Sequence, residues 1–172
     1  MVIVSLLKRC LYFLIKLSMK KKYIGILCLI LVGIIALDRS TNVAMSPNDY
    51  VSLGNQMGMK GDHVGASKFF KNSMKIDPYH IPAYLGLGIA YGNLGKDEDA
   101  IEVFKEGIKL DNVHNFTPQM QMGIAAIAYD KMNNREIAVK YVKKALQMYT
   151  DQGNYAGVAI AAQKLKQISP DS

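Results

Sequence analysis

Histidines are the first side chains in this sequence whose type could support catalysis or metal binding. Of the 3 histidines, His80 and His114 occupy matching sequence surroundings in successive segments, and His63 lies beside a predicted turn. Ligands to one zinc ion must lie within about 2–2.3 Å of it, and equivalent placement in successive segments puts His80 and His114 one repeat apart, too far for one ion. We therefore expect the histidines to be solvent-exposed turn residues rather than ligands or catalytic bases.

A run of carboxylates, Asp97, Glu98, Asp99 and Glu102, is the second candidate for chemistry. Apolar residues follow it at helical spacing. Carboxylates in the first turn of a helix complement the partial positive charge of its free N–H groups. The cluster therefore indicates the start of a helix, not a metal site.

The two cysteines, Cys10 and Cys28, both lie in apolar N-terminal segments and do not have the spacing of a metal-ligand pair. The sequence also has no nucleophile elbow, glycine-rich phosphate loop or HExxH motif. We predict that the protein is not an enzyme, and that it has no cofactor, no metal and no small-molecule substrate.

The charge of the chain is concentrated at its N-terminus. The formal net charge is +7, but residues 43–172 contain 14 Lys and Arg against 13 Asp and Glu, so +6 lies in residues 1–42. In residues 43–172 Lys and Glu are interspersed, as on solvated helix faces, whereas a phosphate-binding surface needs clustered cations. We therefore predict no nucleic-acid partner.

Residues 23–37 form an uncharged apolar run between Lys20–Lys22 and Asp38–Arg39. As a helix the run would rise about 22 Å, short of a bilayer core of about 30 Å unless flanking lysines snorkel or the bilayer thins. We predict that residues 19–42 are a transmembrane signal anchor and linker. Because six basic residues precede the run, we predict a single-pass protein with a cytoplasmic N-terminus and an extracytoplasmic domain, periplasmic in a bacterium.

Two alternatives remain open at the N-terminus. The apolar run also suits a cleaved signal peptide, although small residues are poorly placed for cleavage. Residues 1–18 resemble a basic amphipathic helix that lies along a membrane surface. They are equally consistent with a mis-assigned start, the true start being Met19, because Met19 and three lysines resemble the beginning of an export signal.

An internal repeat organises the rest of the chain, because residues 47–80 align with residues 81–114 without a gap. Bulky residues stand three or four positions from small ones, which places both on one helix face. Gly61 and Gly95 stand where the first helix of each pair must end. The sequence thus predicts helical hairpins whose packing residues are Tyr50, Leu53, Gly54, Ala66, Phe70, Tyr84, Leu87, Gly88, Tyr91, Ala100 and Phe104.

This pattern resembles the tetratricopeptide repeat (TPR), whose signature of large, Leu, Gly, aromatic, Ala, aromatic, small and Pro residues spans 34 positions. A weaker third unit fits residues 119–152 after an insertion at 115–118, and its packing residues include Met122, Ala125, Ala126, Tyr129, Ala138, Val142 and Ala145. Residues 154–168 predict a capping helix, with Tyr155, Val158, Ala162, Leu165 and Ile168 near one face. The expected fold is all-α: a TPR-type α-solenoid of three hairpins, in residues 47–152, plus the cap, behind an N-terminal membrane helix.

The resemblance implies a concave groove lined by the first helix of each hairpin. It places Asn48, Val51, Asn55, Leu85, Ile89, Asn93, Met120, Ile127 and Asp130 there. The carboxylate clamp of some family members would need basic residues at Val51, Met120 and Ile124, so an apolar helix or an extended segment suits the groove better. The apolar positions among these residues are equally consistent with the core.

Two functions are consistent with this sequence. The first is a non-enzymatic scaffold, anchored to a membrane, that binds a partner protein or peptide in the groove. The alternative is an exported soluble TPR module, released by signal cleavage, that acts as an envelope assembly or chaperone-like adaptor.

Overall fold

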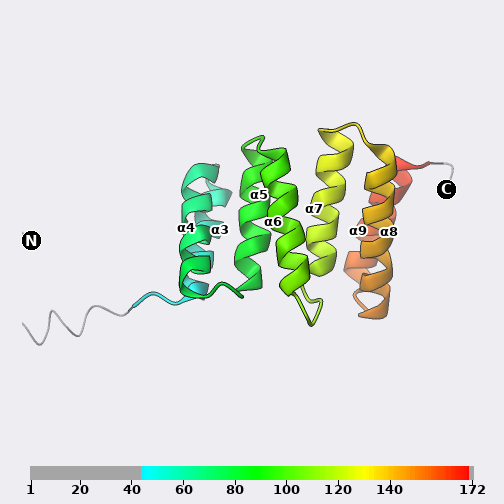
Figure 1. The fold of residues 1–172 in the computed structure, drawn as a ribbon. Coiled ribbons are helices and arrows are strands. Elements are labelled where there is room, and N and C mark those ends of the chain that lie inside the picture. The colour runs from blue at the N-terminus through cyan, green and yellow to red at the C-terminus, as the bar shows by residue number, and fades with distance from the viewer. Residues whose placement is uncertain (1–43, 171–172) are drawn as a thin grey trace, which may run out of the picture. The chain divides into compact units, whose positions relative to one another are not determined.

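The computed structural model describes residues 44–170, and all regular structure in this range is α-helical. The seven helices are α3 (Pro47–Met59), α4 (His63–Ile76), α5 (Ile81–Asn93), α6 (Asp97–Leu110), α7 (Thr117–Asp130), α8 (Arg135–Asp151) and α9 (Tyr155–Ile168). Consecutive helices pack against each other, and Figure 1 shows the hairpins α3/α4, α5/α6 and α7/α8 one after another, with α9 packed against α8. The expected all-α fold of three hairpins and a final helix is confirmed.

The predicted membrane anchor lies outside the described residues. Within residues 44–170, none of the helices has the length and apolar character that crossing a bilayer requires.

Residues with positive φ mark the turns that follow α3, α5, α7 and α8. Gly61, Gly95 and Gly153 follow α3, α5 and α8 with φ of 81°, 70° and 66°, a region that residues with a Cβ rarely enter. The backbone N–H two residues beyond α3 and α5 donates to the carbonyl three residues upstream, as in Gly95 to Gly92 at 3.1 Å. The turn after α7 differs, since Asn133 takes the positive φ, at 49°.

Several helices begin at side chains that accept hydrogen bonds from free backbone N–H groups. Before α3, Ser46 and Asp49 cap each other reciprocally in a capping box. The side chains of Asp62, Asn134 and Asn154 accept from the N–H three residues later, at 2.7–3.0 Å. Of the helices α4, α6, α8 and α9, three therefore begin at a capping side chain of the preceding turn, and α6 is the exception.

Helix pairing within and between hairpins depends on two phenylalanines held against glycine. A Cβ added to Gly54 would lie 2.7 Å from Cε1 of Phe70, and one added to Gly86 would overlap the same ring. Phe70 is 3% exposed, so a single aromatic ring fills the space between its own first helix, α3, and the first helix of the next hairpin, α5. Phe104 repeats the arrangement one unit later, against Gly88 of α5 and Gly123 of α7.

The third hairpin departs from the predicted register by one residue. In α7 the buried positions include Ile124 and Ala125, at 1% and 0% exposure, where α5 buries Leu87 and Gly88. Each of these α7 residues lies 37 positions after its counterpart in α5, and so does Gly123 after Gly86. In the second helices the separation is 38 positions, from Ala100 to Ala138. The predicted alignment of Ala126 with Gly88 is therefore wrong for α7.

The extra residue lies in the turn between α7 and α8, which spans positions 131–134, whereas the turn between α5 and α6 spans only positions 94–96. The connection between α6 and α7, residues 111–116, is also longer than the connection 77–80 between α4 and α5. Asp111 fixes this longer connection: it is 2% exposed, and its Oδ2 accepts from the N–H groups of Phe116 and Thr117, both at 2.7 Å, and from the Thr117 hydroxyl at 2.9 Å.

The final helix covers the end of the core with three of the five residues predicted for that face, namely Val158, Leu165 and Ile168. Gly157, Ala161 and Ile168 are buried, with Val158 and Leu165 packed beside them, whereas Tyr155 is 86% exposed and Ala162 is exposed. Arg135, at the start of α8, donates a hydrogen bond to the carbonyl of Ile168 and so holds the end of α9.

Candidate functional site

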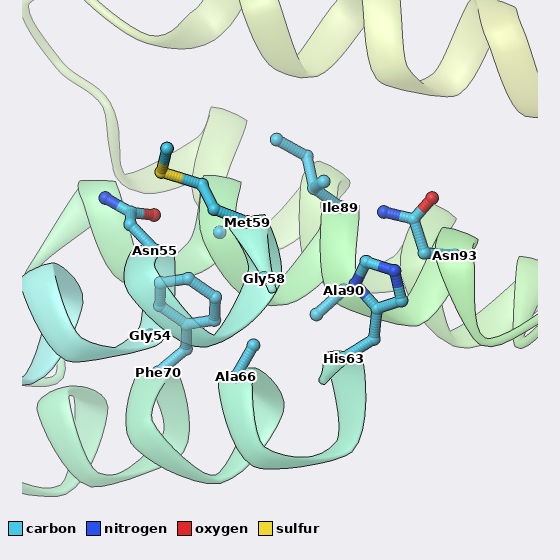
Figure 2. A pocket seen from close by; sticks show the side chains of 11 residues that line it. Gly54, Asn55, Gly58, Met59, His63, Ala66, Phe70, Ile89, Ala90 and Asn93 are labelled. Atoms are coloured by element: carbon cyan, nitrogen blue, oxygen red, sulfur yellow. The ribbon is translucent and has the colours of Figure 1, made fainter. Parts of the chain in front are cut away.

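The first helices of the hairpins carry a hollow between α3 and α5 with a volume of about 460 Å³. Its floor is apolar and made of small residues around the Phe70 ring. In Figure 2, Phe70, Ala66 and His63 belong to α4 and lie below the gap between the two first helices. The residues that line the hollow are Gly54, Asn55, Gly58, Met59, His63, Ala66, Phe70, Gly86, Ile89, Ala90 and Asn93.

A second hollow, of about 200 Å³, lies between α5 and α7. It shares Ile89 and Asn93 with the first, so the two form one continuous groove, which we call the first-helix groove. Its floor is again a phenylalanine beside glycines. The lining residues are Gly88, Ile89, Gly92, Asn93, Asp97, Phe104, Gly123, Ala126, Ile127, Asp130 and Lys131.

The exposed side chains at the groove are apolar or carry amides. Ile89 is 51% exposed and Met59 is 89% exposed, although both are large hydrophobic residues. Asn55 and Asn93 stand near them with both hydrogen-bond donors and acceptors available to a ligand backbone. Such a surface can hold an extended chain through apolar contacts and backbone hydrogen bonds.

The histidines and carboxylates of the described residues are spread over the chain. No group of three or more His, Cys, Asp or Glu residues within positions 44–170 is arranged to hold a metal ion. The predicted exposure of His80 is wrong: its side chain is 14% exposed and its Nδ1 lies 3.9 Å from a carboxylate oxygen of Asp77. His114 is exposed in the connection before α7, and the acidic run Asp97–Asp99 forms the first turn of α6, as the sequence predicts.

Whether a residue predicted from sequence lines the groove depends on which half of its first helix it occupies. Asn55, Ile89, Asn93, Ile127 and Asp130, all in the C-terminal halves, line the groove. Their partner-binding role stays a prediction.

The remaining predicted residues lie in the N-terminal halves and do not line it. Met120 is 0% exposed and belongs to the core beside Gly107 and Phe104, so its prediction as a groove residue is wrong. Val51 and Leu85 are half-buried against the core, which fills the space between the helices there. Asn48 is exposed near the start of α3, away from both hollows.

Sequence reasoning missed several groove residues near the hairpin turns: Met59 at the end of α3, His63 and Asp97 at the starts of second helices, and Lys131 in the turn after α7. A signal was present for two of them, because His63 and Asp97 hold equivalent positions in successive repeats and each begins the second helix of its hairpin. Asp97 also has one carboxylate oxygen, Oδ1, that is buried without a hydrogen-bond partner.

Two buried tyrosines have altered acidity, and both are structural. Burial, followed by the nearby Glu106, raises the pKa of Tyr84, whose hydroxyl donates to the carbonyl of Pro78 at 2.8 Å. Burial likewise raises the pKa of Tyr149, whose ring packs on Gly157 of α9. Neither residue lines the groove.

Residues 81–114, the second predicted unit, match the family model of the tetratricopeptide repeat. The seven helices have the TPR-like all-α fold that the resemblance implied.

Among curated proteins, Protein bimA of Emericella nidulans is 25% identical over 104 residues, which are 60% of this chain and 12% of bimA. The chain therefore corresponds to a small part of that relative.

Solved structures share the fold. PcrH from Pseudomonas aeruginosa has a TM-score of 0.64 at 22% identity, over 72% of this chain and 91% of PcrH, and it has also been solved with the chaperone binding region of PopD. SycD, a type III secretion chaperone of Yersinia enterocolitica, was solved with a peptide of the translocator YopD; it has a TM-score of 0.62 at 20% identity, over 70% of this chain and 90% of SycD. The seven helices thus have the same fold as PcrH and SycD.

Proposed function

We propose that this protein is a non-enzymatic interaction module that binds an extended segment of a partner protein in the first-helix groove. The observation that carries the proposal is the continuity of the two hollows through Ile89 and Asn93, with large apolar side chains exposed along them. The complexes of PcrH and SycD support it, because proteins with this fold hold segments of partner proteins.

The chemistry of the groove narrows the kind of segment. Ile89 and Met59 favour apolar ligand side chains, and Asn55 and Asn93 suit a ligand backbone. The described groove residues in the first hollow include no Lys or Arg, so recognition of a terminal carboxylate is disfavoured there.

Partner capture with two matched variants tests the groove. Full-length tagged protein would be cross-linked in its native cells and isolated with its partners, alongside Ile89→Asp and Ile76→Asp. The two isoleucines are 51% and 52% exposed, but Ile76 lies at the end of α4 away from the groove. We expect Ile89→Asp to lose a partner that the wild type and Ile76→Asp both retain. Equal recovery by all three proteins would show that the groove is not the binding surface.

We further propose that residues 19–42 tether the module to a membrane, with the N-terminus in the cytoplasm and the repeats on the extracytoplasmic side. The uncharged run 23–37 and the basic residues before it support this. Tethering would raise the effective concentration of the groove near partners at the same membrane. Carbonate extraction is the test: an anchored protein stays in the membrane pellet, whereas release would favour the alternative, a soluble exported adaptor.

A further inference from the structure

A second groove lies between the second helices α6 and α8, above residues of α7, with a volume of about 670 Å³. Its apolar surface comes from Ile101, Ile124, Met132, Ile137 and Tyr141. Met132 and Ile137 are each 40% exposed, so these large side chains remain in contact with solvent. The groove, which we call the second-helix groove, shares no lining residue with the first-helix groove.

The two walls of this second-helix groove differ in charge. The α6 wall carries Glu98, Glu102 and Glu106 at four-residue steps, which places the three carboxylates in one row. Lys105 and Lys109 also line this wall, so its charged lining residues are three acidic and two basic.

The α8 wall has the opposite balance. Lys140 lines the groove, and Nζ of Lys144 lies 5.7 Å from the centre of the Tyr141 ring. Lys140 and Lys144 are four positions apart, so both lie on the face of α8 that carries Tyr141.

None of these charges is neutralised within the described part of the chain. The ion pairs among residues 44–170 are His80 with Asp77 and Lys164 with Asp130, and both lie away from this groove. The groove is therefore an apolar strip between an acidic wall and a basic wall, with both rows of charge available to a ligand.

We propose that the second-helix groove binds an amphipathic helix of a partner protein. The helix has an apolar stripe with basic residues on the edge that meets α6 and acidic residues on the edge that meets α8. An apolar groove between two helices suits the apolar face of a third helix. The α6 wall runs from Glu98 to Lys109, about 16 Å, which matches three turns of a bound helix. Complementary edges would select this partner, because like charges across an interface are repulsive.

Three synthetic helical peptides, each of about four turns so that the three central turns can span the α6 wall, test the proposal on the full-length chain in detergent. All carry the same leucine stripe; the first has lysines on one edge and glutamates on the other, the second has lysines on both edges, and the third has glutamates on both. A photo-reactive residue replaces Ile137 in the groove or, as a control, Ile76 outside it. Local cross-linking reports binding at the groove and ignores peptide taken up by micelles.

We expect saturable cross-linking at position 137 and none at position 76, with the mixed-edge peptide binding roughly tenfold more tightly than either of the others at low salt. In Glu98→Lys/Glu102→Lys both walls become basic, so the preference should pass to the peptide with glutamates on both edges. Both positions are exposed, but Glu98 lies in the first turn of α6, where a reversed charge opposes the helix dipole, so the variant should stay folded with a slightly lower unfolding temperature.

Three results would overturn the proposal: no saturable cross-linking at position 137, an equal affinity for all three peptides, or an unchanged ranking in the charge-reversed variant. Cross-linking of the same peptides to a photo-reactive residue at position 89, and not at 137, would assign them to the first-helix groove and would equally reject the second site.

Discussion

Replacing glycine by alanine at two positions of α3 should change stability in opposite directions. In a helix, alanine is favoured over glycine by about 0.5–1 kcal/mol, so an unobstructed Gly→Ala substitution stabilises. At Gly58 the added Cβ would meet nothing closer than the Ala66 Cβ at 4.0 Å, an ordinary contact. At Gly54 it would meet three Phe70 ring carbons at 2.7–3.0 Å.

The magnitude at Gly54 follows from where the ring can go. Carbon atoms pack best at about 3.5–4.0 Å, so Phe70 would have to move by about 1 Å. It cannot move toward α5, because Gly86 already lies against the same ring. Overpacking of this kind costs about 1–3 kcal/mol, which exceeds the helix-propensity gain. We expect Gly54→Ala to destabilise by about 1 kcal/mol and Gly58→Ala to stabilise by about half that.

Thermal unfolding of the full-length chain, followed by helical circular dichroism, measures both effects. For a folded region of this size 1 kcal/mol corresponds to about 3–4 °C, so the two variants should unfold on opposite sides of the wild type. A double-mutant cycle identifies the obstacle, since Phe70→Leu should reduce the cost of Gly54→Ala. The reasoning fails if Gly54→Ala raises the unfolding temperature, or if its cost is the same with leucine at position 70.

Three further substitutions test the caps and the titrating groups. Asp111→Ala should destabilise by about 2–3 kcal/mol, because it leaves buried donors of Thr117 unpaired; a loss below about 1 kcal/mol in urea unfolding would contradict this. The raised pKa of Tyr84 means that the folded state holds the phenolic proton more tightly than the unfolded state does. The stability that this hydroxyl contributes is therefore complete below pH 10 and is lost as pH rises through the folded pKa. Tyr84→Phe should show a shallower alkaline loss of stability than the wild type. The hydrogen bond from the Ser46 backbone N–H lowers the pKa of Asp49. The stability that this carboxylate contributes is therefore present above pH 3.8 and is lost as pH falls through the lower folded pKa. Asp49→Asn should remove this loss at acid pH, and an unchanged pH profile of stability would reject the prediction.

The first two hairpins could be predicted closely because their packing residues recur at one spacing. Phe70 and Phe104, with Gly54 and Gly88, make the same contacts in successive units. Gly86 could not be found in this way. It packs against Phe70 of the preceding hairpin, and the corresponding position of the first unit, Ser52, has no described hairpin before it and is exposed. A comparison of the first two units therefore reveals packing within a hairpin but not packing between hairpins.

The same distinction explains the error in the third unit. A comparison that followed contacts between hairpins would align Gly123 with Gly86, since each receives the phenylalanine of the unit before it. With that alignment, α5 and α7 are further apart in sequence than the first helices of the first two units, α3 and α5. It also requires an extra residue in the turn between α7 and α8, where Asn133 has positive φ. Stacking thus preserves which face of each helix meets its neighbour, while the connections absorb changes in length.

The register of the first helices also determines which residues can take part in binding. Where these helices approach through their N-terminal halves, Val51, Leu85 and Met120 fill the space as core. Toward the hairpin turns the small residues around each phenylalanine leave room, and the exposed Ile89 stands above a floor that the ring supplies. The glycines that let the hairpins stack are therefore the same residues that open the groove. A change at Gly54 that displaces Phe70 should consequently weaken partner capture as well as stability. Gly58→Ala should raise stability without displacing the ring, so it should not weaken capture through Phe70.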